Sequence, residues 1–449
     1  MTTPEEIGIL KNSIEVLEMG LLKLEYAQDV DPMLTENILL EVANKMTNNY
    51  PYHHPLYAGQ MLKPPHPVAR LAYTLAMQIN PNNHALDGSR ASSPMEKEAV
   101  QQLAHMFGYE RHIGHLTGGG TMANLEALWI ADQIHPGKVV VASEHSHYTH
   151  ERISSVLKIP FRKVKADKWG KMDIADLKQQ LERDTNIGTV VVTLGTTGTG
   201  SVDPLEDIIK LQQEFDFRIH VDAAYGGYFR LASNLQKKVS RRFAAIPRAD
   251  SIVIDPHKHG LQPYGCGCIL FKDPSVGQFY SHDSPYTYFT SDELHLGEIS
   301  LECSRAGAAA VALWATLKHF PLVKNGNMAE GMDRCHAAAV SLFQKIEDDP
   351  GFITLFEPET DIVVWAAKGT SLSEISKKNQ RLFDYYARQD LHLALFNHPA
   401  HLLPDHWEEI AKDQDYVTCL RSCLMKWEHI DWVDRIWEII RNSVTTTID

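Results

Sequence analysis

The stretch Ser251-Ile-Val-Ile-Asp-Pro-His-Lys-His-Gly decides how the rest of this chain is interpreted. Its first four residues form an apolar run, and the Asp-Pro and Gly that follow are typical of a turn. We therefore predict a buried strand over Ser251–Ile254, and the next apolar run, 266–271, predicts another strand. Lys258 then lies at the end of a rigid element, where α/β proteins place their chemistry.

Lys258 has an unusual setting, because two histidines flank it at the end of a buried strand. The plain alternative is a solvated surface charge, which is what most single lysines are. A lysine that forms a Schiff base needs a partly desolvated amine to act as a nucleophile, and this setting can provide one. The hypothesis that organises the rest of the sequence is that Lys258 carries pyridoxal 5'-phosphate (PLP).

Length and composition bound the possible classes of protein. With 449 residues, 44% of them hydrophobic, the chain can form a large core in two or three domains. A net charge of −14 argues against nucleic acid or an anionic membrane as the main partner. The six cysteines lack zinc-type spacing, so we expect no metal and a reduced, cytoplasmic setting. No apolar run is long enough for a membrane span, and the first residues lack a basic start and an apolar core, so we expect neither a membrane span nor a signal peptide.

Alternation of strand and helix patterns predicts an α/β fold with a mainly parallel central sheet covered by helices on both faces. Strands are predicted at 138–142, 161–165, 189–194, 217–222, 251–254 and 266–271, and helices at 121–133, 173–183, 203–214 (capped by Asp203) and 306–319. Ser93-Pro-Met-Glu96 predicts a helix start with a capping box. We expect an N-terminal helical and extended segment (1–90), a large domain (91–330) and a smaller α+β domain (331–449).

The N-terminal segment has two parts. Residues 4–50 carry apolar side chains every three or four positions, which predicts amphipathic helices. Residues 50–67 are rich in histidine and proline and predict an extended stretch. Either this stretch is a polar connector on the surface, or it lines a pocket with Tyr57, Gly59, Gln60 and Met61 near a substrate.

A glycine-rich turn, Leu116-Thr-Gly-Gly-Gly-Thr-Met-Ala-Asn, leads directly into a predicted helix. Glycines let the backbone approach a ligand closely, and a helix N-terminus offers free N–H groups to an anion. Thr121 adds a hydroxyl, so the turn is a candidate phosphate site. The alternative is a tight turn with no ligand.

Two other strand ends carry polar groups of a kind that a cofactor needs. Asp222, in His-Val-Asp-Ala-Ala, could pair with a pyridinium nitrogen, an attraction of roughly 5 kcal/mol before desolvation. Such pairing keeps the ring protonated and makes PLP an electron sink; the alternative is an aspartate that caps the next turn. The run 143–149 contains His145 and His147, either of which could stack on a ring, unless the run is simply a polar loop. Thr197 lies in a hydroxyl-rich turn after a further strand.

In combination, these blocks resemble the group II PLP-dependent amino acid decarboxylases of fold type I (PLP-dependent transferase-like), such as the aromatic amino acid and glutamate decarboxylases. The resemblance is carried by the Gly-Gly-Thr, His-Val-Asp-Ala-Ala and Asp-Pro-His-Lys blocks, in that order. It implies PLP-dependent decarboxylation of an L-amino acid to its amine, through an imine on Lys258. It also implies a homodimer with shared active sites.

The resemblance assigns roles to individual residues. Lys258 would hold the cofactor, Asp222 the pyridinium, and His147 would stack on the ring, with His145 the less favoured choice. The remaining cofactor contacts implied are Gly119, Gly120, Thr121, Thr197, Ala224, Asp255 and His257. For the acid that protonates the product carbon, the family uses a tyrosine on a loop after the lysine strand; the candidates here are Tyr288, Tyr286 and His295.

Several alternatives stay open at this point. Without such an acid the carbanion could meet oxygen and give an aldehyde. A PLP carbon–carbon lyase acting on a phosphorylated amino alcohol shares the fold, and an aminotransferase or a protein without activity fits less well. Arg305 is structural or binds an anion, and Arg421 either reaches a substrate carboxylate or lies on the surface. The substrate is not readable: the segment Tyr57–Met61 and the aromatic residues Tyr286–Phe289 favour an aromatic amino acid, whereas the histidines allow an acidic one.

Overall fold

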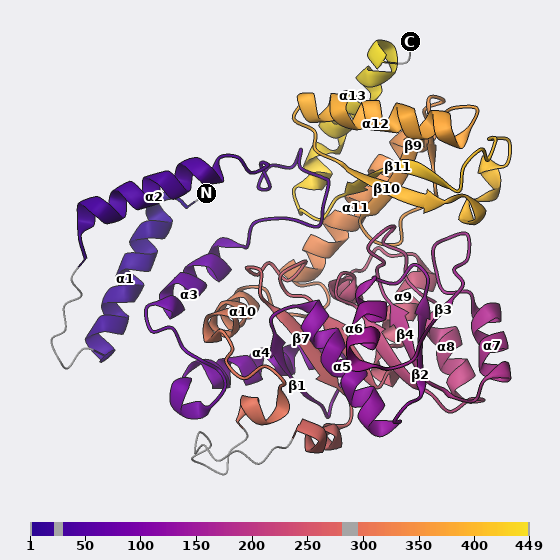
Figure 1. Cartoon of the computed structure of the whole chain (residues 1–449). Helices are drawn as coiled ribbons and strands as arrows, with labels where there is room; N and C mark the ends of the chain where they lie inside the picture. The colour runs from indigo at the N-terminus through magenta and orange to yellow at the C-terminus, as the bar shows by residue number, and fades with distance from the viewer. Residues whose placement is uncertain (1, 22–29, 281–294, 448–449) are drawn as a thin grey trace.

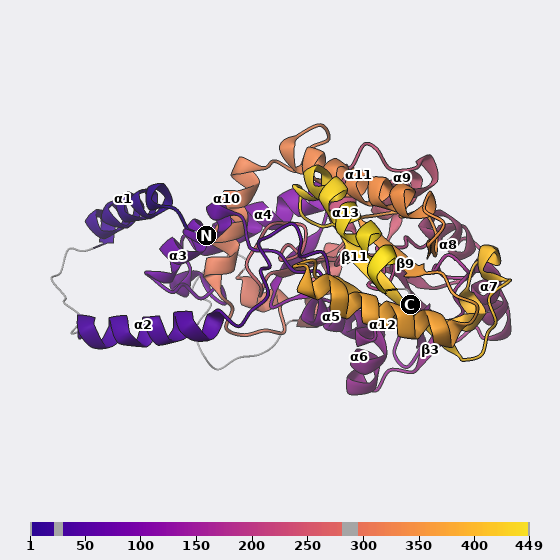
Figure 2. The same ribbon diagram turned by 90° about the horizontal axis from the view of Figure 1, so that it is seen from above.

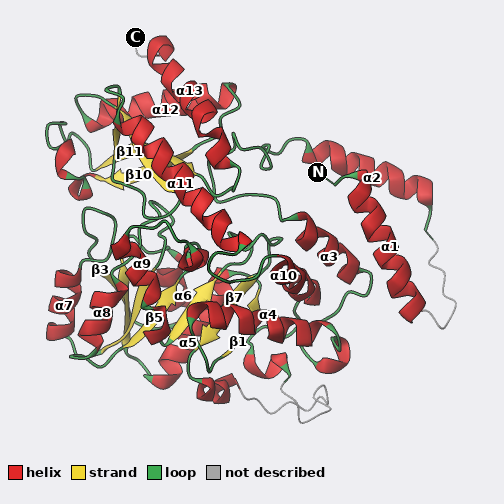
Figure 3. Cartoon of the chain, turned by 180° about the vertical axis from the view of Figure 1, so that it is seen from behind, coloured by secondary structure: helices red, strands yellow, loops and turns green. Residues whose placement is uncertain are grey.

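The computed structural model describes residues 2–21, 30–280 and 295–447 (Figure 1). Two separate sheets organise it, one of seven strands and one of four (Figure 3). The helices α1 (Pro4–Leu21) and α2 (Pro32–Met46) project to one side of the body in two perpendicular views (Figures 1 and 2). Within the described ranges, none of the helices has the length and apolar character needed to cross a bilayer.

The seven-stranded sheet has the order β1-β7-β6-β5-β4-β2-β3. Its strands are β1 (Ile113–Thr117), β2 (Val139–Ser143), β3 (Phe161–Val164), β4 (Ile187–Thr193), β5 (Arg218–Asp222), β6 (Ser251–Ile254) and β7 (Gly267–Phe271). β7 runs antiparallel to both β6 and β1, and the other pairings are parallel. The mainly parallel sheet is therefore confirmed, and β1, β2, β4, β5 and β6 all end at the same edge.

Helices cover both faces of this sheet. Alternate residues of each strand point to opposite sides, so both faces carry apolar side chains that helices bury. Val140 and Ala142 of β2 pack with Leu128 of α5 (Gly120–Ile134) and Ile153 of α6 (Thr149–Leu157). Val139 and Val141, the alternate residues of β2, join a larger core on the other face. That face carries α4 (Ser92–Phe107), α7 (Ile174–Arg183), α8 (Leu205–Gln212), α9 (Lys237–Ala244) and α10 (Gly307–His319).

The C-terminal part forms the antiparallel sheet β10-β11-β9-β8 with helices packed against it. Its elements are α11 (Asn327–Glu347), β8 (Phe352–Thr354), β9 (Ile362–Ala367), α12 (Leu372–Arg388), β10 (Ala394–Pro399), β11 (Tyr416–Cys423) and α13 (His429–Thr447). The histidine- and proline-rich segment before α3 (Pro67–Met77) joins this part, since Leu56 and Ala58 are buried in its core. The interpretation of these residues as a surface connector is therefore wrong.

Two predicted helix caps are also wrong. The side chain of Asp203 accepts hydrogen bonds from the N–H groups of Met172 and Thr193 (both 2.8 Å), outside α8. Burial raises the pKa of Asp203 to about 7, against those two hydrogen bonds. Ser93 lies inside α4 and pairs with the hydroxyl of Ser89. Asp203 thus bonds to other elements of the fold instead of capping α8, whereas Ser93 bonds to a residue four positions earlier in the chain.

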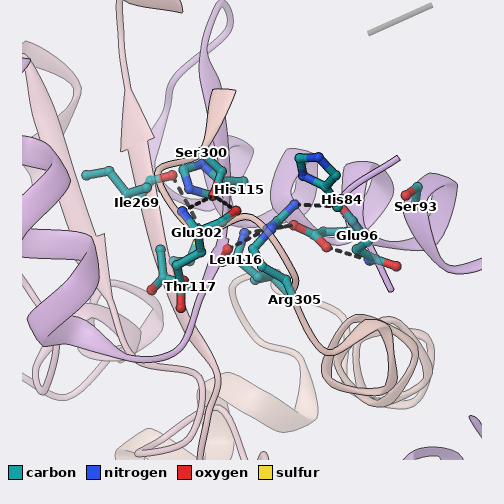
Figure 4. A network of polar contacts seen from close by, with 12 residues as sticks. His84, Ser93, Glu96, His115, Leu116, Thr117, Ile269, Ser300, Glu302 and Arg305 are labelled. Carbon is teal, nitrogen blue, oxygen red and sulfur yellow. Dashed lines mark hydrogen bonds and ion pairs between the residues drawn. The ribbon is translucent and has the colours of Figure 1, made fainter. Parts of the chain in front are cut away.

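Glu96, predicted to close the capping box, lies instead at the centre of a buried polar network (Figure 4). Its carboxylate accepts hydrogen bonds from Arg305 (2.7 Å), Asn83 (2.6 Å) and the N–H of Leu116 in β1 (3.0 Å). Arg305 also donates to the carbonyls of Leu116 and Asn83 (2.7 and 3.0 Å). The network ties α4 and the segment before α10 to the strand that precedes the glycine-rich turn.

We predict that Arg305→Met lowers the melting temperature of the protein clearly. Removing one partner of a buried ion pair leaves the other charge uncompensated, which costs roughly 3–5 kcal/mol. Lys318→Met is the matched control, because its ion pair with Glu98 joins α10 to the same helix α4, but at the surface (3.5 Å). Thermal unfolding followed by circular dichroism compares the two. An equal effect of the two substitutions would contradict the structural role of Arg305.

Candidate active site

A cavity of about 570 Å³ opens at the edge where the parallel strands end. It is lined by residues from the glycine-rich turn, from the ends of β4, β5 and β6, and from the run before α6. The lining residues are Gly118, Gly119, Gly120, Thr121, Met122, Asn124, Leu125, His147, Thr193, Gly195, Thr197, Asp222, Ala224, Tyr225, Asp255, His257, Lys258 and Glu302. Every residue that the resemblance assigned to cofactor binding is in this wall.

Lys258 reaches the cavity from the turn that follows β6. Its Nζ lies 3.1 Å from Oδ2 of Asp255, and its side chain is 21% exposed, so the amine is partly desolvated. Nε2 of His257 lies 3.5 Å from the same oxygen, and Nδ1 of His257 contacts the carbonyl of Cys266 (2.8 Å). Burial lowers the pKa of His257, more than the charge of Asp255 raises it. The three side chains thus form one compact polar group.

The glycine-rich turn forms the adjoining wall. Gly119 has φ 149° and ψ 173°, a conformation that is open to glycine and strained for other residues. α5 begins immediately after it and has no acidic residue in its first turn, so its free N–H groups face the cavity without a competing charge from the helix. A Cβ on Gly120 would lie 2.7 Å from Oδ2 of Asp255. The turn therefore comes close to the Lys258 group only because its residues are glycines.

Asp222 is a buried carboxylate at the end of β5. Its Oδ1 accepts the N–H of Ala224 (3.0 Å), and its Oδ2 contacts Nε2 of His150 (2.8 Å) and the amide of Asn124 (3.3 Å). Burial alone would raise the pKa of Asp222, but the hydrogen bond and charge of His150, with the N–H of Ala224 and the charge of Lys258, together outweigh burial and lower the pKa. The carboxylate is therefore ionised.

His147 lies on the wall beside these groups. Its Nδ1 is 2.5 Å from the hydroxyl of Thr149, and its ring is 4.4 Å from that of Tyr148. Burial lowers the pKa of His147, against the charge of Asp222. Its imidazole is therefore neutral near neutral pH. His145 is outside the cavity wall, and its ring packs 5.8 Å from that of His398.

Other candidates lie elsewhere. Tyr286 and Tyr288 are outside the described residues. His295 is buried outside the cavity wall, where its Nδ1 accepts the N–H of Leu86 (3.1 Å) and its side chain caps the short helix Leu296–Ile299. Tyr57 is buried against the C-terminal part and its carbonyl accepts from Lys426 (2.6 Å). None of Tyr57, Gly59, Gln60 and Met61 is among the residues that line the cavity.

Arg421 lies behind the wall formed by Thr197. Its guanidinium donates to the carbonyl of Thr197 (2.9 Å) and to Gln60 (2.8 Å), and the residue is only 6% exposed. The surface alternative for Arg421 is therefore wrong. Its contact with a substrate carboxylate stays a prediction.

Several residues of the site could not be singled out from the sequence. Asn124 and Glu302 line the cavity, and the Glu302 carboxylate accepts the N–H of Gly118 (2.9 Å). His150 is hidden behind Asp222. The sequence offers one signal for His150, which is its spacing from His147. His150 follows His147 by three residues at the start of a helix, so both side chains can lie near Asp222.

The described residues fit PLP. The wall offers an amine for the aldehyde of PLP and an ionised, buried carboxylate for its pyridinium. It also offers a neutral imidazole for the flat ring and a helix N-terminus for the phosphate. The Thr193 hydroxyl and Oδ1 of Asp255 are buried without a hydrogen-bond partner in the described part of the chain, as expected of a polar wall built for a ligand.

Comparisons with known proteins point to the same cofactor. Residues 124–368, just over half of the chain, match the pyridoxal-dependent decarboxylase conserved domain. An L-tyrosine decarboxylase of Enterococcus faecium is 28% identical, over 80% of this chain and 78% of that protein. A probable L-tyrosine/L-aspartate decarboxylase of Methanothermobacter thermautotrophicus is 26% identical, over 85% and 96%. The crystal structure of Oryza sativa TDC with PLP and tryptamine has a TM-score of 0.80 and 16% identity, over 99% and 97%.

Proposed function

The chain belongs to the pyridoxal-dependent decarboxylases, PLP enzymes that convert an L-amino acid to its amine, and we propose that Lys258, Asp222 and His147 carry that reaction here. The observation that supports these roles is the partly desolvated Lys258 amine, which faces the same cavity as the ionised carboxylate of Asp222. When bound, PLP supplies a protonated ring that accepts the electrons left by the departing carboxylate.

The remaining wall residues would bind and orient the cofactor. Lys258 would hold its aldehyde carbon, and the α5 N-terminus with Gly119, Gly120 and Thr121 would hold its phosphate. His257 and Asp255 lie beside that turn, and Thr197 and Ala224, which also line the cavity, would contact the ring. Asp222 would hold a proton on the ring nitrogen, and the neutral imidazole of His147 would stack on the ring.

The proton donor to the product carbon is the least constrained role. We propose Tyr288, following the family's use of a tyrosine after the lysine strand. His295 is the weaker candidate, since its Nδ1 is already engaged by Leu86 and the side chain is outside the cavity wall.

For the substrate, we propose an L-amino acid with an uncharged, aromatic side chain. The relatives are named for tyrosine or for tyrosine and aspartate, so charge decides between these classes. The described lining contains three carboxylates, Asp222, Asp255 and Glu302, and its one lysine already pairs with Asp255. An acidic side chain would enter this negative setting without a free lysine or arginine from the described wall, whereas a phenol carries no charge.

We propose that the protein is a homodimer in the cytoplasm. We also propose that each chain divides into three parts, at about residues 90 and 330. No described residue of α1 or α2 is buried, and both helices expose large apolar side chains, among them Met19 (78%) and Met33 (72%). Apolar faces of this size mark an interface, and a second copy of the chain is the partner that the family implies. All six cysteines are free, in keeping with a reducing compartment; cell fractionation would check the location.

We predict that Lys258→Ala abolishes both turnover and the visible absorbance of the bound cofactor, because the amine that holds PLP is removed. PLP-loaded protein should be incubated with tyrosine, aspartate and a pool of other amino acids, with and without oxygen, while amines, aldehydes and carbon dioxide are measured. Lys272→Ala is the matched control, because this exposed lysine lies outside the cavity wall. Amine from an aromatic substrate would support the proposal. Unchanged activity in Lys258→Ala, or aldehyde as the only product, would refute it.

We predict that the double substitution Leu34→Glu and Ile38→Glu shifts the protein from dimer to monomer, since it places two charges on an apolar face of α2. Sedimentation velocity measures the mass directly. Asn37→Glu with Asn44→Glu adds the same charge to the same helix at polar positions and should leave the dimer intact. A wild-type protein that sediments as a monomer at micromolar concentration would exclude the homodimer.

A further inference from the structure

His150 is the one fully buried histidine that contacts Asp222 among the described residues. It lies in the first turn of α6, and its Nε2 is 2.8 Å from Oδ2 of Asp222. It is outside the cavity wall and wholly shielded from solvent, so it cannot touch a substrate. Whatever His150 does for the reaction must therefore act through Asp222.

The direction of the hydrogen bonds around Asp222 can be worked out from its neighbours. Asn124 donates its amide N–H to Oδ2 of Asp222, so its carbonyl oxygen accepts from Nε2 of His220 (2.8 Å). Nδ1 of His220 is then the acceptor for the hydroxyl of Ser251 (2.9 Å). Burial lowers the pKa of His220 to about 3, so this ring is neutral and its tautomer is set by the chain of contacts.

The same reasoning applies to His150. Because the Asp222 carboxylate is ionised and only accepts hydrogen bonds, Nε2 of His150 must carry the proton. Its Nδ1 has no hydrogen-bond partner within the described residues. Two donors, from His150 and Asn124, thus converge on Oδ2, and the N–H of Ala224 holds Oδ1. Of the two side-chain donors, His150 makes the shorter contact.

We propose that His150 is a positioning residue that keeps Asp222 ionised and holds its carboxylate plane toward the cavity. A carboxylate buried to this degree would otherwise tend to take up a proton, because burial disfavours the charged form. A protonated Asp222 could not hold a second proton on the ring nitrogen of PLP. The inference rests on the proposed role of Asp222 and adds a residue that makes that role possible.

The test uses two amide substitutions that differ in reach. The amide nitrogen of Gln stands close to the position of the histidine Nε2, so His150→Gln can still donate to Asp222. His150→Asn carries the same amide but is one methylene shorter and cannot reach. Two quantities are measured: the dissociation constant of PLP for the apoprotein, and the ¹⁵N chemical shift of the ring nitrogen in holoprotein reconstituted with ¹⁵N-labelled PLP.

We expect His150→Asn to weaken PLP binding about tenfold to a hundredfold, the usual effect of losing a hydrogen bond to a charged group. Its ring-nitrogen resonance should move from the protonated toward the unprotonated position. His150→Gln should stay within about threefold of wild type and keep the protonated resonance. His145→Phe is the control for loss of a partly buried histidine in the same region, because its ring packs on His398 instead of Asp222.

The outcomes separate this inference from the proposed function. If wild-type protein binds PLP with a protonated ring nitrogen, and His150→Asn behaves identically, the role of His150 is refuted while that of Asp222 stands. If the wild-type ring nitrogen is unprotonated, the role of Asp222 fails, and this inference fails with it. A difference between the Asn and Gln variants in both measurements, with His145→Phe unchanged, supports the proposal.

Discussion

The ionised carboxylate of Asp222, buried at the end of β5, is the interaction on which the rest of the site depends. A charge in such a place persists only where hydrogen bonds and neighbouring charges offset its lost hydration. Three donors do this here, from His150, Asn124 and the N–H of Ala224. They come from α6, α5 and the turn after β5, so the fold must bring these elements together before the carboxylate can be used. The ionised state of Asp222 therefore depends on the sheet and on the packing of α5 and α6 against it.

The parallel arrangement explains why residues far apart in the chain share one cavity. β1, β4, β5 and β6 end at one edge, and the segments that follow them supply the glycine-rich turn, Thr197, Asp222 and Lys258. The C-terminal part contacts the residues at this edge and holds them in place. Its Asp361 accepts the hydroxyl of Tyr225 (2.7 Å) and pairs with Nε2 of His259 (3.2 Å), the residue next to Lys258. Arg421 similarly holds the carbonyl of Thr197.

Much of this could be predicted, because near-continuous apolar strands and turn residues act over short distances in the sequence. β6 begins and ends at the predicted residues, and all the predicted cofactor contacts line one cavity. Failures occurred where a tertiary partner outcompeted a local one. Glu96 and Asp203 carry cap patterns but bond to other elements. His150 acquires its role only when α6 packs beside β5. No local pattern encodes such contacts. In addition, β1 was not predicted as a strand.

The central claim is that one lysine holds the cofactor, and the most direct test is chemical. Protein reconstituted with PLP is reduced with borohydride, which fixes a lysine-bound aldehyde as a stable amine, and the modified peptide is then identified by mass spectrometry. The account predicts modification at Lys258. Lys426 is the informative competitor, because burial lowers its pKa to about 8 and so favours a reactive, neutral amine. Specific labelling of Lys426 or another lysine, with Lys258 unmodified, would contradict the account.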